Sequence, residues 1–222
     1  GKKGLGTLLE RLDRFGKRLR LSSMEDNLID EDFLDKLSKL KNFCPHFHLS
    51  LQSGSDSVLK KMNRHYTTEE FENSVNLIRK HFPLAGITTD IIVGFPTETE
   101  EEFLQTMKFV EKVKFSQLHI FPYSKREGTV AAKLYKDLPG QVKADRMKRL
   151  SELGKRLKNE FILKNKTAKV LIEEKNGEYF EGYSENYIKC YIKGDFAVGD
   201  VVSVELVKPF KHGALCKFKQ EN

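Results

Sequence analysis

Apolar and polar residues repeat with two different periods along this chain. Up to about residue 160, segments with apolar residues three or four positions apart predict helices, and they alternate with short apolar segments that predict strands. The predicted strands cover 17–23, 47–52, 87–94 and 117–123. Strands joined by helical crossovers run parallel and need cover on both faces. This part is therefore predicted to be α/β, a partial (β/α) barrel of four units with two open edges.

Local signals mark where several helices begin. Asp30 is a good N-cap, Thr67 or Thr68 caps the next helix, and Thr99 precedes three glutamates that favour a helix amino terminus. After Gly140, apolar residues at helical spacing predict one long helix that ends near Lys164.

After about residue 160 the pattern changes to short alternating strands separated by glycines. These strands are predicted at 169–173, 179–183, 188–192, 201–206 and 214–218. Five strands at this spacing are typical of a small antiparallel β-barrel of the oligonucleotide-binding type. We therefore divide the chain into a barrel part with a basic linker helix, residues 1–156, and a second domain, residues 157–222.

Composition excludes several classes of protein. The chain has 222 residues, of which 39% are hydrophobic, and no apolar run is long enough to cross a bilayer. A disordered chain and a membrane span are both excluded, and no secretory signal pattern is present. Cys44, Cys190 and Cys216 are too far apart for a close-spaced metal or cluster motif. We expect buried thiols in a reducing compartment and a cytoplasmic protein.

Positive charge is concentrated in one predicted helix. The formal net charge is +7, and residues 141–157 hold six basic and two acidic side chains. The basic residues are Lys143, Arg146, Lys148, Arg149, Lys155 and Arg156. Such a helix either presents a solvated face or binds a polyanion such as RNA, and the sequence alone does not decide between them.

The ends of the predicted parallel strands are the expected place for a ligand. They read 22–25, 52–55, 93–98 and 123–129, and all are rich in hydroxyl groups, glycine and charge. Glu25, Gln52 and Arg126 have the chemistry to hold ribose hydroxyls or a carboxylate. The alternative is that these residues make turns and face solvent.

Three polar residues lie inside the predicted strands. Asp90 interrupts an apolar strand, where an unpaired carboxylate is costly, so it is either a site residue, a partner of a buried arginine or a structural cap. His46 and His48 share one face of a strand, but with no third ligand we do not expect a metal site.

Several motifs resemble one enzyme family. Residues 48–55, 60–64, 89–99 and 121–129 occur in the order and spacing of the MiaB-type radical S-adenosylmethionine methylthiotransferases, and the second barrel resembles their TRAM domain. Residues 21–25, 121–126 and 182–187 look most like the MtaB branch. The resemblance implies an enzyme that makes the 2-methylthio form of N6-threonylcarbamoyladenosine beside the anticodon of tRNA.

The resemblance also implies roles for individual residues, with no catalytic residue and no metal ligand in this chain. The cofactor S-adenosylmethionine would be bound by Ser23, Glu25, Gln52, Ser53, Asp90, Gly94, Phe121, Tyr123 and Ser124. The substrate, a tRNA anticodon stem-loop, would be contacted by Arg126, Tyr187, Lys189 and Lys193. The alternative for the tyrosine is packing within the small barrel.

One feature of the family is missing from these residues. The family carries a CxxxCxxC triad for one 4Fe-4S cluster and three further cysteines for a second, and the sequence contains neither set. We therefore expect this chain to begin before the third barrel strand, to need the N-terminal part of the same protein, and to be inactive alone. A crystal contact or homo-oligomer contact would cover an open sheet edge.

Two other functions remain open at this point. In the first, the chain belongs to a methylthiotransferase that modifies another tRNA adenosine or a ribosomal protein. In the second, the chain is a non-catalytic RNA-binding module with a degenerate half barrel.

Overall fold

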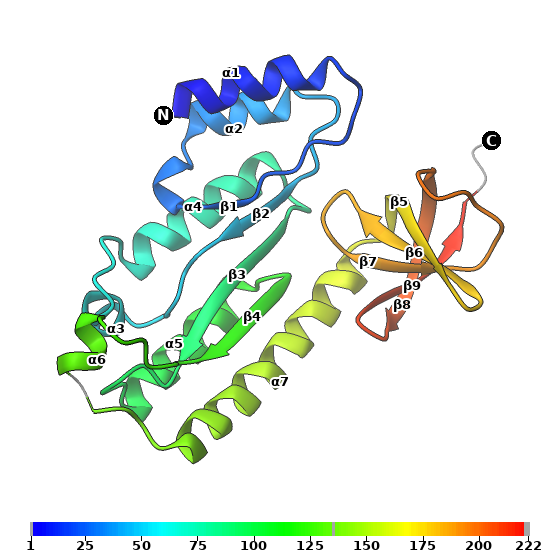
Figure 1. Ribbon diagram of the computed structural model, residues 1–222. Coiled ribbons are helices and arrows are strands. Elements are labelled where there is room, and N and C mark those ends of the chain that lie inside the picture. Colours follow the sequence, from blue (N-terminus) through cyan, green and yellow to red (C-terminus); the bar gives the residue numbers. More distant parts are fainter. Residues whose placement is uncertain (1, 135, 220–222) are drawn as a thin grey trace.

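The computed structural model describes residues 2–134 and 136–219. It contains a parallel sheet with helices and a small closed barrel, joined by the long helix α7 (Gly140–Lys164) (Figure 1). Among these residues, no helix is long and apolar enough to cross a membrane.

The sheet has the parallel arrangement that the sequence predicted. Its strands are β1 (Ser23–Met24), β2 (His46–Leu49), β3 (Gly86–Val93) and β4 (Gln117–Pro122), in the order β1-β2-β3-β4. All three pairings are parallel. This confirms a parallel α/β sheet, in which the carboxyl ends of the strands share one edge.

The segment 17–23 forms much less strand than its alternation predicts. Only its last residue belongs to β1, and Leu19 makes an isolated bridge to Phe43. Its neighbours Arg18 and Arg20 reach the second barrel instead, where Arg18 donates to the carbonyl oxygen of Tyr183 at 3.1 Å. A contact so distant in sequence leaves no local signal.

The helices cover one face of the sheet, and most begin where the sequence predicts. They are α1 (Lys2–Asp13), α2 (Glu31–Ser38), α3 (Asp56–Lys61), α4 (Thr68–His81), α5 (Glu100–Val113) and α6 (Val130–Leu134), with a 3-10 turn at Asp26–Leu28. Asp30 caps α2, whereas Thr67 and Thr99 form capping boxes for α4 and α5. The sequence analysis did not predict α3 and α6.

The two faces of the sheet differ in chemistry. Phe47, Ile87 and Ile91 are fully buried in one hydrophobic core with side chains of α4, α5 and α7. The alternate positions, such as His48 and Asp90, carry polar side chains on the opposite face. The sheet thus has an apolar face that its helices bury and a polar face that they leave open.

The second barrel is closed, and it corrects one prediction. Its strands are β5 (Thr167–Asn176), β6 (Tyr179–Ser184), β7 (Lys189–Ile192), β8 (Val201–Phe210) and β9 (Gly213–Phe218), in the order β5-β6-β7-β9-β8. The prediction of a small five-stranded barrel is confirmed and four of its five pairings are antiparallel, but β7 and β9 pair in parallel, so the barrel is mixed. A closed ring of five strands cannot alternate in direction all the way round, so one parallel pair is required.

Helix α7 belongs to both hydrophobic cores. Leu150, Leu153 and Leu157 pack into the core of the sheet, whereas Ile162 packs into the core of the barrel. The predicted division between residues 156 and 157 falls inside this helix.

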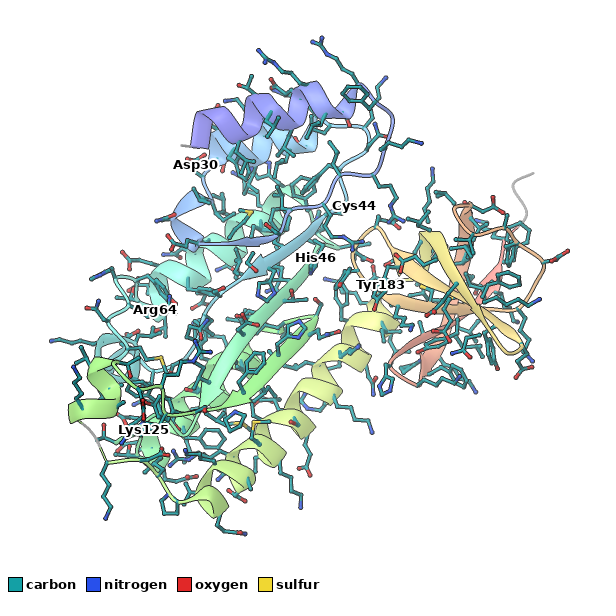
Figure 2. The ribbon with its side chains drawn as sticks, in the orientation of Figure 1. Asp30, Cys44, His46, Arg64, Lys125 and Tyr183 are labelled. Atoms are coloured by element: carbon teal, nitrogen blue, oxygen red, sulfur yellow. The ribbon has the colours of Figure 1, made fainter. Side chains whose placement is uncertain are left out.

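The barrel contacts the sheet at the amino ends of β2 and β3. The Asn186 side chain donates to the carbonyl oxygen of Leu84 at 2.9 Å, and the His46 ring stacks on Tyr187 with centroids 4.3 Å apart. A Cβ atom on Gly86 would lie 2.1 Å from the carbonyl oxygen of Asn186. Figure 2 shows His46 facing the barrel near Tyr183. Only glycine permits this approach, which we call the junction (Leu84–Gly86 against Tyr183–Tyr187).

Replacing Gly86 tests whether the junction holds the two parts together. In Gly86→Ala the added methyl group must push the barrel from the sheet, at a cost of about 1–3 kcal/mol. We expect faster hydrogen exchange in residues 183–188, measured by mass spectrometry. Gly140→Ala, where a Cβ meets nothing within 4 Å, is the control. Unchanged exchange in Gly86→Ala would contradict the junction.

Candidate functional site

A pocket of about 560 Å³ opens at the carboxyl ends of β3 and β4. It is lined by Gln52, Asp90, Ile92, Phe95, Phe121, Pro122, Tyr123, Ser124, Arg126, Thr129 and Ala131. This volume lies in the range of small-molecule sites. The structure thereby brings together Gln52, Asp90, Phe121, Tyr123, Ser124 and Arg126 from the residues that the sequence analysis proposed.

Gln52 is fixed at the pocket by an unusual backbone conformation. Its φ angle is 69°, a value uncommon for residues other than glycine. Its N–H donates to the carbonyl oxygen of Asp90, and its own carbonyl oxygen accepts from the N–H of Ile92, both at 2.9 Å. The backbone after β2 is therefore tied to β3 at the pocket edge.

Asp90 takes part in a chain of hydrogen bonds along the polar face. His48 Nε2 lies 3.2 Å from Asp90 Oδ2, and His48 Nδ1 lies 3.0 Å from Thr88 Oγ1. Thr88 Oγ1 also lies 3.0 Å from His46 Nε2. The chain is consistent when each histidine carries its proton on Nε2, so that Thr88 donates to His48 and His48 donates to Asp90. The partner of Asp90 is thus a histidine and not a buried arginine.

Burial keeps His46 uncharged. Desolvation lowers the pKa of His46 to about 3, and the positive charge of Arg20 acts in the same direction. Burial also lowers the pKa of His119, although the carboxylate of Asp90 opposes this effect. In the described residues, Nδ1 of His46 is buried without a hydrogen-bond partner.

The pocket has an aromatic wall and a polar end. Phe95 and Tyr123 meet edge to face with centroids 5.4 Å apart, and Phe121 is half exposed. Gln52 and Asp90 supply the hydrogen-bonding groups. A planar ring that carries hydroxyl or charged substituents matches this combination.

Four of the proposed cofactor residues lie outside the pocket. Ser23 and Glu25 are exposed at the end of β1, and Glu25 lines a separate groove of about 400 Å³. Ser53 is fully buried, with its hydroxyl 3.3 Å from Thr106 Oγ1. Gly94 is buried beneath α7, where a Cβ atom would lie 2.6 Å from Cγ of Lys143.

The residues proposed for RNA on the second barrel already have partners. Tyr187 lies in the junction, with Arg20 4.3 Å from its ring centroid. Lys189 pairs with Glu181 at 2.6 Å, and Lys193 pairs with Glu178 at 2.5 Å. Only Arg126 lines the pocket.

A buried ion pair supports the loop beneath the pocket. Oε2 of Glu98 accepts from the N–H of Gly94 at 2.8 Å and from Arg146 Nη1 at 2.5 Å. Burial raises the pKa of Glu98, although both of these donors favour its charged form. Removing one partner of such a pair typically costs about 3–5 kcal/mol. The ion pair therefore fixes α7 against the end of β3.

The described residues offer no fit to a metal cluster. No group of three or more His, Cys, Asp or Glu side chains within residues 2–134 and 136–219 is placed to hold a metal ion. The three cysteines are buried. The hydrogen bond to Cys216 and burial raise the pKa of Cys190 well above its usual value, so this thiol remains protonated.

Sequence reasoning missed several residues of the pocket wall. Ile92 lies two positions after Asp90 on β3, so strand alternation alone places both on one face. Phe95 belongs to a strand end that the sequence analysis had singled out. Thr129 likewise belongs to the strand end 123–129 that the sequence analysis had singled out, whereas Ala131, in α6, carried no such signal.

Comparison with known proteins gives relatives along most of the chain. A family model described as the Radical SAM superfamily matches residues 4–110. The threonylcarbamoyladenosine tRNA methylthiotransferase MtaB of Bacillus subtilis is 38% identical over 216 residues, which are 92% of this chain and 48% of that protein. MtaB of Aquifex aeolicus is 43% identical over 188 residues, 84% of this chain and 45% of that protein.

Other relatives carry a different name. The tRNA-2-methylthio-N(6)-dimethylallyladenosine synthase of Oceanobacillus iheyensis is 40% identical over 213 residues, 92% of this chain and 41% of that protein. The chain thus spans about half the length of the curated relatives it matches. Among solved structures, the Escherichia coli coproporphyrinogen III oxidase HemN, a radical SAM enzyme, aligns with a TM-score of 0.56 at 17% identity. The alignment covers 92% of this chain and 49% of HemN, and at this identity it supports the fold alone.

The low pKa of His46 predicts a pH-dependent stability. Because the pKa falls from 6.5 in the unfolded chain to about 3 in the fold, the unfolded state binds more protons between these values. The contribution of His46 to the free energy of unfolding is therefore fully present above about pH 6.5, and it is lost as the pH falls towards 3. Between pH 7 and pH 5 we expect a loss of about 1–2 kcal/mol from this group, measured by urea unfolding.

His46→Gln should remove that loss, because glutamine keeps hydrogen-bonding capacity towards Thr88 but does not titrate. His65→Gln, at an exposed histidine, is the control and should keep the pH dependence of the original chain. If His46→Gln and His65→Gln lose equal stability between pH 7 and pH 5, His46 is not the buried neutral group described here.

Proposed function

Because the chain belongs to the MtaB/MiaB family of radical SAM methylthiotransferases, we propose that its residues serve an enzyme that methylthiolates C2 of N6-threonylcarbamoyladenosine in tRNA. The observation that carries this proposal is the extent of the match. The alignment with the MtaB protein of Bacillus subtilis covers 92% of this chain, and the alignment with that of Aquifex aeolicus covers 84%. It therefore extends beyond the residues 4–110 that the superfamily model matches.

We place S-adenosylmethionine in the pocket at the ends of β3 and β4. The adenine ring would pack on Ile92 and Phe121, whereas Gln52 and Asp90 would bind the polar groups of the ribose or the methionine part. Arg126 would contact the carboxylate or the RNA substrate. When bound, S-adenosylmethionine supplies the radical and the methyl group.

The chain's own contribution is positioning and exclusion of water. His48 donates to one carboxylate oxygen of Asp90, so the carboxylate is held in one orientation before a ligand arrives. The aromatic wall of Phe95, Phe121 and Tyr123 excludes water from one side of the pocket. Ser53 and Gly94, which lie behind the pocket, would act through the loops that they support.

The iron–sulfur clusters of the family do not fit the residues of this chain. The 222 residues contain no CxxxCxxC triad, and the described ones hold no group of metal-ligating side chains. We therefore derive no step through a cluster. The expectation that this chain alone is inactive stays a prediction.

A second candidate substrate has its own support. The identity to the dimethylallyladenosine synthase of Oceanobacillus iheyensis, 40%, lies between those to the two MtaB proteins, 38% and 43%. Similarity alone therefore does not separate N6-threonylcarbamoyladenosine from N6-dimethylallyladenosine as the substrate. A direct measurement of the product is required.

A chimera distinguishes these substrates. Residues of this chain replace the matching 216-residue part of the Bacillus subtilis MtaB in a strain without its own enzyme, and the nucleosides of the tRNA are analysed by mass spectrometry. We expect 2-methylthio-N6-threonylcarbamoyladenosine. The methylthio product of dimethylallyladenosine instead, or a soluble, cluster-loaded chimera that forms neither product, would refute the proposed substrate.

The same chimera tests the pocket. Asp90→Asn removes the charge that the pocket offers, and the loss of a hydrogen bond to a charged group predicts a fall in S-adenosylmethionine cleavage of about ten- to a hundredfold. Asp195→Asn, at an exposed position of the barrel, is the control. Equal cleavage by both variants would place the cofactor elsewhere.

A further inference from the structure

Half of the basic residues on α7 are already paired with carboxylates. Of its basic residues, four form ion pairs: Lys143 with Asp137, Arg146 with Glu98, Arg149 with Glu100 and Arg156 with Glu111. These ion pairs stabilise the helix surface, and because their cations already contact carboxylates they attract a polyanion only weakly. The other four, Lys148, Lys155, Lys158 and Lys164, form no ion pair with any residue that the structure describes.

Two of these unpaired lysines, Lys155 and Lys158, line a cleft between the two parts of the chain. The cleft has a volume of about 480 Å³ and is bounded by β4, by α7 and by the turn between β8 and β9. Its cationic side chains are Lys155 and Lys158 of α7 and Lys211 of the turn, and the imidazole of His212 lies beside them. No aspartate or glutamate lines it. The cleft therefore collects positive charge from two domains with no carboxylate in its lining, and Glu178, which pairs with Lys193, acts on Lys211 from outside it.

Lys158 is the most constrained of these cations. Its side chain is half-buried, and its Nζ donates to Oε1 of Gln117 at 2.9 Å. Burial lowers its pKa, because no carboxylate in the described part of the chain compensates for lost water. A cation held in this way gains most from an anionic ligand that enters the cleft.

Lys211 connects the cleft to a cluster of aromatic rings. It lies in the turn with a φ angle of 49°, a conformation that glycine or asparagine adopts more readily. Its Nζ lies 5.3 Å from the ring centroid of Tyr179, 5.2 Å from that of Tyr191 and 5.4 Å from that of Phe210. A cationic group beside aromatic faces is the combination used to bind single-stranded nucleic acid.

Close packing of α7 on β4 gives the cleft its floor. Gly154 lies against Leu118, where a Cβ atom would be 3.1 Å from Cδ1 of that residue. The side chains of Ser151 and Asn159 add neutral hydrogen-bonding groups on the same helix. Ammonium, amide and hydroxyl groups around one hollow suit the oxygens of a phosphate.

We propose that this interdomain cleft binds backbone phosphates of the RNA substrate through Lys155, Lys158 and Lys211. The inference rests on the proposed function, because it assumes that the protein acts on tRNA. It assigns the positioning of the RNA to the cleft, in place of Lys189 and Lys193, which are paired with carboxylates. Cations on both walls, next to aromatic rings, favour a polynucleotide over a lone phosphate ion.

Binding of fluorescently labelled tRNA to the full chain, followed by anisotropy, tests the cleft. The double variant Lys155→Gln/Lys158→Gln removes two phosphate contacts, so we expect about tenfold or greater weakening at about 0.1 M salt. The slope of log affinity against log salt should fall by about two in magnitude. Lys211→Gln should lower affinity in the same direction.

The control removes the same charge elsewhere. Lys108→Gln/Lys148→Gln changes two exposed lysines that do not line the cleft. Equal weakening by the two double variants would overturn the cleft and leave only general electrostatic attraction. Lys158→Arg keeps the charge and should retain most of the affinity of the original chain for tRNA. Lys158→Met keeps the apolar length but not the charge, and it should lose affinity. Thermal unfolding of every variant shows that the fold is intact.

Two further arms identify the ligand. Inorganic phosphate that binds the original chain tightly and displaces no tRNA would assign the cleft to a free anion and overturn the proposal. Tight binding of polyglutamate to the cleft lysines, without competition by tRNA, would assign it to an acidic protein. If the unaltered chain binds no tRNA at all, the proposal that these residues serve a tRNA-modifying enzyme loses its support. If binding persists in the cleft variants, only the location is wrong.

Discussion

The structure depends on the close approach of Gly86 to Asn186. No other residue type fits at that position, because its Cβ atom would lie 2.1 Å from a carbonyl oxygen. The approach places the small barrel at the amino ends of β2 and β3, away from the pocket at the carboxyl ends of β3 and β4. It also lets the turn between β8 and β9 meet α7 and β4, which creates the cationic cleft. This steric constraint thus determines where the cleft between the two parts lies, whereas the pocket is built by the sheet and its loops alone.

The polar face of the sheet explains why the pocket lies at one end of it. The helices bury the apolar face, and Thr88 and His48 connect the buried His46, which stacks on Tyr187 of the junction, to Asp90 of the pocket. The charge of Asp90 lies at the end of this chain, where the pocket opens. At the opposite end, burial against the barrel keeps His46 neutral. The same face therefore provides an uncharged contact with the barrel and a charged site for a ligand.

Sequence alone predicted the features that local chemistry determines. Asp30, Thr67 and Thr99 cap helices through neighbours three residues away, and the rule that ligands gather at strand ends led to Gln52 and Asp90. What it missed depends on long-range contacts. Arg18 reaches Tyr183, 165 residues later, so the segment 17–23 formed little strand. The ion pairs of α7 likewise join residues far apart, which is why charge clustering left its role undecided.

The most direct test of this account couples the junction to the cleft in a double-mutant cycle. The tRNA affinity is measured for the original chain, for Gly86→Ala, for Lys155→Gln/Lys158→Gln and for the combination of all three changes. If the junction assembles the cleft, Gly86→Ala alone weakens binding, and the two lysine changes have little further effect in its presence. Additive losses, or an unchanged affinity in Gly86→Ala, would contradict the claim that the junction builds the RNA-binding cleft.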